Sequence, residues 1–157
     1  MPPNAVLHHL RMETLTSAAY QEALTRRREM EERLTALDRA AASAPAAPDW
    51  AAEVSRCLIA LHQALAHHVL AVEASDGILG EIVQAAPRLS NAVQAMRDDH
   101  GRLAASIERL LNEVGESPAP ETREGVTELL HVMMLHRQRG SDLVYEAFAR
   151  DIGGLDS

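Results

Sequence analysis

The chain has 157 residues, which suits a single domain, and a formal net charge of −8 with histidine neutral. That charge disfavours nucleic acid as a partner, because phosphate binding needs a basic surface. All fifteen basic residues are arginine, which excludes Schiff-base chemistry, a lysine general base and a Walker A lysine. Aromatic residues make up only 3% of the chain, whereas the helix formers Ala, Leu, Glu and Arg are abundant. This composition predicts an all-α fold, an up-and-down four-helix bundle.

The cysteine content and the apolar stretches indicate the cellular compartment of the protein. The single Cys57 cannot form an internal disulfide. The N-terminus lacks the continuous apolar region of a signal peptide, and we expect no stretch to be long and apolar enough to cross a membrane. We therefore expect a protein of the reducing cytoplasm that does not associate with membranes.

The first predicted helical segment covers about residues 5–42, with a break near residues 14–18. Residues 1–43 are expected to form a charged helical segment that packs on the three remaining bundle helices, in residues 49–154 of the same domain. The charged side chains include the helix-stabilising pairs Glu22–Arg26 and Glu29–Arg33. Because the apolar stripe of this segment is thin, we expect a mainly solvated helix, and a homodimer formed through it is a further expectation.

Three further helical segments are predicted at about residues 49–85, 89–114 and 121–152. Asp49 follows Pro48 and is expected to be the N-cap of the second segment. Residues 75–77 and Gly80 interrupt that segment and permit a kink. Residues 115–120 contain a glycine and two prolines and predict a loop.

A histidine occupies the apolar seam of each of these three segments. The seams are Val54, Leu58, Leu61, Leu65, His68, Val72 and Leu79; Leu89, Val93, Met96, His100, Leu103, Ile107, Leu110 and Val114; and Leu129, Val132, His136, Gly140, Leu143 and Ala147. Each histidine lies near the middle of its segment, so the three can share one layer of the bundle. Gly140 follows one turn after the last of them and suggests the close approach of a bulky group.

Three inward imidazoles on three facing helices suggest a metal site, because each costs about 1–3 kcal/mol when it is buried without a partner. Imidazole and carboxylate ligands suit iron or zinc better than calcium or magnesium. The side chains that could complete a site are Tyr20, Glu31, His62, Glu73 and Asp142, whereas Asp99 is expected to be a solvated flank. The alternative interpretation is three ordinary core histidines, each satisfied by a neighbour.

Three stretches of the chain resemble the hemerythrin-like (HHE cation-binding) domains. They are residues 61–73 (LHQALAHHVLAVE), 96–100 (MRDDH) and 136–148 (HRQRGSDLVYEAF). The resemblance implies a four-helix bundle with a non-haem iron centre, usually di-iron in this family, that binds, senses or scavenges oxygen, peroxide or nitric oxide. The ligands carried over by position are His68, Glu73, His100 and His136.

The chain departs from the family pattern at three ligand positions. Val72 stands where the family has glutamate, Ala104 where it has a second histidine, and Ser141 where it has aspartate. Glu73 and Asp142 each come one residue later. A mononuclear site, an atypical pair and a metal-free bundle therefore stay open. Two alternative functions are a metal-free interaction module and a bundle that binds haem non-covalently, with two of the seam histidines as axial ligands and Arg137 and Arg139 near the propionates.

Overall fold

The computed structural model describes residues 17–149 of the chain. These residues form helices and loops, and no strand occurs among them. The elements are α2 (Ala18–Ala42), α3 (Trp50–Glu73), α4 (Ile78–Ala85), the 3-10 turn η1 (Pro87–Leu89), α5 (Ser90–Glu113) and α6 (Ala119–Phe148). The expected all-α class is confirmed, and the parts of the predicted segments at residues 5–16 and 150–152 lie outside the described residues.

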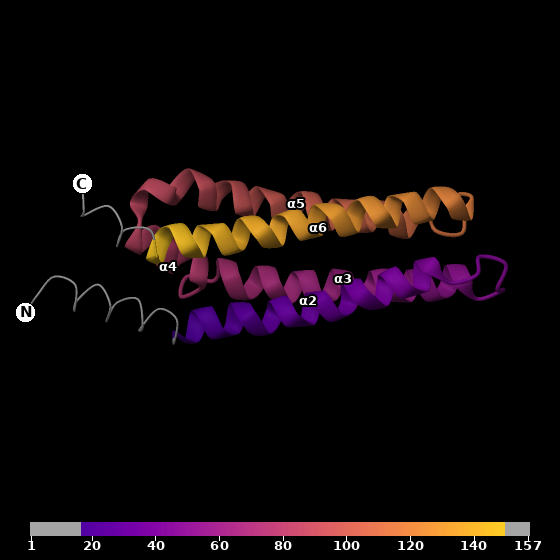
Figure 1. Ribbon diagram of the computed structural model, residues 1–157, viewed down its shortest axis with the longest axis horizontal. Helices are drawn as coiled ribbons and strands as arrows, with labels where there is room; N and C mark the ends of the chain where they lie inside the picture. The colour runs from indigo at the N-terminus through magenta and orange to yellow at the C-terminus, as the bar shows by residue number, and fades with distance from the viewer. Residues whose placement is uncertain (1–16, 150–157) are drawn as a thin grey trace, which may run out of the picture.

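The four long helices run up and down along one elongated bundle (Figure 1). α2 and α3 lie side by side and α5 and α6 form the opposite pair, so that successive helices are antiparallel. The short helix α4 closes one end of the bundle before the chain returns along α5. This topology follows from short connections, which force consecutive helices to become antiparallel neighbours.

The interruption in the second predicted segment is a complete break rather than a kink. α3 ends at Glu73 and α4 begins at Ile78. A Cβ atom at Gly77 would lie 2.6 Å from the carbonyl oxygen of Ala71 and 2.7 Å from that of Val72. Only glycine fits against these backbone oxygens, so Gly77 allows the chain to turn tightly between the two helices.

The helix ends confirm some of the expected signals and correct one. Ser17 caps α2, since its Oγ accepts a hydrogen bond from the backbone N–H of Tyr20 at 3.1 Å. Asp49 holds the expected position before α3, but its side chain makes no capping hydrogen bond. Gly115 ends α5 with a φ of 84°, as expected for a glycine after a helix.

The predicted seams form the core, which consists of two apolar clusters. One cluster lies toward the α2–α3 and α5–α6 loops and includes Leu58, Leu65 and Leu103. The other lies toward α4 and includes Val72, Ile82 and Met96. The seam histidines come between these two sets of residues along each helix. The polar layer therefore separates the apolar core into two parts.

Residues 50–85 form one stretch that is long and apolar enough to cross a membrane by length and composition, with a mean hydropathy of 1.3. The expectation that no stretch meets this criterion was too strict. One third of the most apolar window is buried inside the bundle, and the helix breaks between α3 and α4. A helix that packs in the core of a bundle has the same composition, so the stretch is weak evidence for a membrane span.

We predict that the first half of α2 opens more readily than the rest of the bundle. The buried residues of α2 begin only at Met30, whereas those of α3 begin at Trp50 and continue to Val72. Fewer buried apolar contacts lower the free energy of local opening. Native-state hydrogen exchange should therefore show lower protection for amides of residues 20–29 than for those of residues 58–68. Equal protection of the two segments would contradict this expectation.

Candidate metal centre

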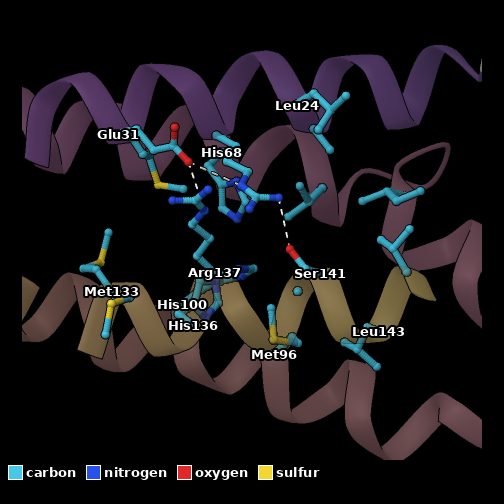
Figure 2. Close-up of a pocket in the computed structure, with 18 of the residues that line it drawn as sticks. Leu24, Glu31, His68, Met96, His100, Met133, His136, Arg137, Ser141 and Leu143 are labelled. Atoms are coloured by element: carbon cyan, nitrogen blue, oxygen red, sulfur yellow. Dashed lines mark hydrogen bonds and ion pairs between the residues drawn. The ribbon is translucent and has the colours of Figure 1, made fainter. Parts of the chain in front are cut away.

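The three seam histidines meet in the middle of the bundle. His68 comes from α3, His100 from α5 and His136 from α6 (Figure 2). Their ring centroids are 5.2 Å apart for His68 and His100, 6.0 Å for His68 and His136, and 4.9 Å for His100 and His136. One ring nitrogen of each histidine lies within 4.8 Å of the other two. The expected shared layer is therefore present.

Two of the imidazoles form a hydrogen bond to a carboxylate through Nδ1. Nδ1 of His100 lies 3.0 Å from Oε1 of Glu73, and Nδ1 of His136 lies 3.4 Å from Oδ2 of Asp99. An ionised carboxylate only accepts hydrogen bonds, so each Nδ1 carries the proton and each Nε2 keeps its lone pair. In metal sites, a carboxylate that accepts the hydrogen bond of one ring nitrogen orients the histidine so that its other nitrogen faces the metal.

The nitrogens that remain have no partner in the described structure. They are Nε2 of His100, Nε2 of His136, and both ring nitrogens of His68, and all four are buried. His100 and His136 are themselves only 4% and 3% exposed. The interpretation as ordinary core histidines requires a neighbour for each imidazole; Glu73 and Asp99 meet this requirement for His100 and His136, but His68 has no such neighbour among the described residues. A metal ion would bind to the lone pairs of these unpartnered nitrogens.

Asp99 is the residue whose role the sequence did not disclose. We expected a solvated flank, but its side chain is only 15% exposed and accepts hydrogen bonds from His136, Arg102 and Arg139. Burial by itself raises the pKa of Asp99, but the hydrogen bonds from Arg102, His136 and Arg139 outweigh it and lower the pKa overall. The signal in the sequence was its position beside His100, which placed it at the edge of the seam.

The electrostatics of the centre keep two of the imidazoles, those of His68 and His136, neutral. Burial lowers the pKa of His68 to about 3, with a further contribution from repulsion by His100 and His136. Burial also lowers the pKa of His136, and the nearby His100 adds to this effect, while Asp99 opposes it. Neutral imidazole is the form that coordinates a metal, so His68 and His136 are in the binding form at neutral pH.

A cavity of about 470 Å³ opens beside the histidines, which form part of its wall. Polar side chains bridge α2 and α6 across it (Figure 2). Glu31 pairs with Arg137 at 3.0 Å, and Arg27 donates to Oγ of Ser141 at 3.1 Å and lies 3.5 Å from Glu31. The other lining residues are mainly apolar. A small molecule that enters the cavity would therefore reach the histidines.

The other proposed site residues lie away from the converging nitrogens. Asp142 is exposed and accepts a hydrogen bond from Gln138 at 3.0 Å, while Glu73 contacts the back of His100. Tyr20 lines the cavity, and Glu31 is held by the two arginines. His62 pairs with Glu108 on the surface. Arg137 and Arg139, which the haem alternative places near the propionates, are about half exposed, and each pairs with a carboxylate.

Met133 is buried, whereas the adjacent Met134 is 57% exposed. The expectation that Gly140 serves the close approach of a bulky group needs correction. A Cβ atom on Gly140 would lie 3.5 Å from Cε of Met96, which is an ordinary contact. Gly140 therefore does not serve a close approach, but its missing side chain leaves room in the cavity wall.

The three imidazoles fit one metal ion with a small adjustment. Nitrogen ligands about 2.0–2.1 Å from a tetrahedral ion are roughly 3.3 Å apart, so each ring would move inward by about 1 Å or less from the observed separation. No carboxylate oxygen belongs to the converging set within residues 17–149. The donor set is thus three imidazoles, two of which are hydrogen-bonded to carboxylates.

Comparison with protein-family models, with curated proteins and with solved structures finds no match to this chain. The geometry of the three-histidine centre is therefore what indicates a function for this protein.

We predict that the metal-free protein loses stability on acidification. The pKa of His68 is about 3 in the folded state, against about 6.5 in the unfolded chain. Between these values the unfolded chain binds more protons, so the free energy of unfolding falls as the pH drops from about 6.5 toward 3. Urea unfolding of chelator-treated protein should show a lower midpoint at pH 5 than at pH 7.5.

The same experiment on two variants isolates the contribution of the buried ring. His68→Leu should flatten the pH dependence, whereas His131→Gln, at an exposed position, should leave it unchanged. An unchanged slope in His68→Leu would show that the acid sensitivity arises elsewhere.

Proposed function

We propose that this protein is a hemerythrin-like metal-binding bundle whose three-histidine centre binds a small molecule at an open position of the metal. The observation that carries the proposal is a cluster of three histidines in a cavity wall, in which one ring nitrogen from each lies within 4.8 Å of the others and four buried ring nitrogens have no hydrogen-bond partner among residues 17–149. Leaving such groups unpaired is costly, and the carboxylates behind His100 and His136 already orient both rings for coordination.

The donor set favours a single non-haem ion of iron or zinc. Imidazole suits both metals, and calcium and magnesium would need oxygen ligands that are absent from the converging atoms. A di-iron centre would need bridging carboxylates, but Glu73 and Asp99 are engaged with the histidine Nδ1 atoms. With three protein ligands, the ion retains an open position for water or a small ligand. Oxygen, peroxide and nitric oxide are the small oxidants we expect at an iron centre.

The two alternative functions have less support. Axial ligation of haem would require a porphyrin between two imidazoles, but for every pair of rings here the third imidazole lies within 6.0 Å of both, in the space that the macrocycle would need. A metal-free interaction module would leave the orphaned nitrogens unexplained. A homodimer through the N-terminal helix stays a prediction, as does the cytoplasmic location.

The first test measures metal content and stability together. Protein purified without a histidine tag should contain about one equivalent of iron or zinc by elemental analysis. His68→Leu should abolish this binding and yet raise the stability of the metal-free protein by about 1–3 kcal/mol, because both ring nitrogens of His68 lack partners. A metal-free wild type with a destabilised His68→Leu variant would refute the proposed function.

The second test concerns the carboxylate behind His100. Glu73→Gln should weaken metal binding by about 10- to 100-fold, because the amide no longer holds the imidazole as a charged acceptor. Glu108→Gln is the matched control, since Glu108 contacts the exposed His62 at 3.2 Å and lies away from the centre. Competition with a chromophoric chelator gives both affinities. Equal affinities for the two variants would show that Glu73 does not support a metal ligand.

A further inference from the structure

The cavity beside the histidines extends toward the α4 end of the bundle as an apolar lobe. Its walls there are formed by side chains of α2, α4 and α6, including Leu24, Ile78, Ile82 and Leu143. Gly140 and Ala23 contribute little or no side-chain volume to this wall, which helps to keep the lobe open. The whole cavity measures about 470 Å³ and also reaches Leu34, Leu130 and Met134 on the other side of the histidines. Mainly apolar walls with a few polar groups are typical of a small-molecule site, and the space is larger than a diatomic ligand needs.

The charge around the three histidines determines which head group a ligand in this cavity carries. Three neutral imidazoles do not offset the charge of a divalent ion. Of the two carboxylates behind the rings, Asp99 is already paired with Arg102 and Arg139. At the rim, the guanidinium groups of Arg27 and Arg137 share one carboxylate, Glu31, although Asp38 also lines the cavity. The histidine floor, once it holds its metal, therefore attracts an anion.

We propose that the cavity binds an aliphatic monocarboxylate of medium chain length, with its carboxylate at the histidine floor and its chain in the apolar lobe. This inference rests on the proposed metal-binding function and names the class of ligand for the same site. The apolar wall contributes affinity through burial of methylene groups, while the charge of the floor fixes the orientation.

The test uses zinc-loaded full-length protein and a series of carboxylates, namely acetate, butyrate, hexanoate, octanoate and decanoate, in calorimetric titrations. Affinity should rise by about fourfold per methylene until the lobe is full, since each buried methylene contributes a roughly constant increment. Octan-1-ol and octyltrimethylammonium should bind at least tenfold more weakly than octanoate. Removal of the zinc should weaken octanoate binding by at least tenfold.

A matched pair of glycine substitutions tests the position of the chain. Gly140→Leu places a side chain in the lobe and should weaken octanoate binding by at least tenfold while leaving acetate binding unchanged. Gly101→Leu, on the exposed face of α5 where an added Cβ atom would meet no neighbouring group within 4 Å, should leave both unchanged. Both variants replace a helical glycine by a helix former, so neither should prevent folding.

Elemental analysis of the same samples separates the two proposals. Stoichiometric zinc with affinities that do not depend on chain length, or with no effect of Gly140→Leu, overturns the ligand assignment and leaves the metal-binding function intact. Protein that holds no zinc refutes the proposed function. Chain-length-dependent binding that is equal with and without zinc would show that the carboxylate does not sit at the metal floor, and would also overturn the assignment.

Discussion

The enclosure of three imidazoles in one layer of the bundle is the constraint on which the rest of this structure depends. The layer separates two apolar clusters, and four of its buried ring nitrogens have no hydrogen-bond partner within residues 17–149. Apolar residues at these positions would pack without this penalty, so the layer weakens the metal-free core. A bound metal ion would give these nitrogens a partner, and its binding would stabilise the fold, because the folded chain already holds the three imidazoles close together.

The carboxylates behind the rings show how the bundle prepares the centre. Glu73 is the last residue of α3, and Asp99 precedes His100 on α5 while it contacts His136 on α6. Each carboxylate thus links two helices through an imidazole. Arg102 and Arg139 hold Asp99 in its ionised form, which keeps the proton of His136 on Nδ1. The centre and the helix packing therefore support each other.

The cavity beside the histidines results from the way α2 packs on the bundle. The stripe of α2 is thin, and only its C-terminal half is buried, so the space between α2 and α6 is not completely filled by side chains. Ion pairs and hydrogen bonds from Arg27, Glu31 and Arg137 bridge this opening in place of apolar contacts. The incompletely filled space between α2 and α6 therefore gives access to the centre.

The sequence by itself determined the helices, the seams and the depth of His68, His100 and His136, because these follow from a period of 3.6 residues and from counting along each helix. It also placed the interruption near Gly77, although not its extent, since the contact between Gly77 and the carbonyl groups of α3 is set by the folded backbone. Only the tertiary structure decided which carboxylates serve the centre. Asp99 contacts a histidine 37 residues away, and Glu73 one 27 residues away. Such pairings depend on how the helices are rotated against one another, which no local pattern in the chain specifies.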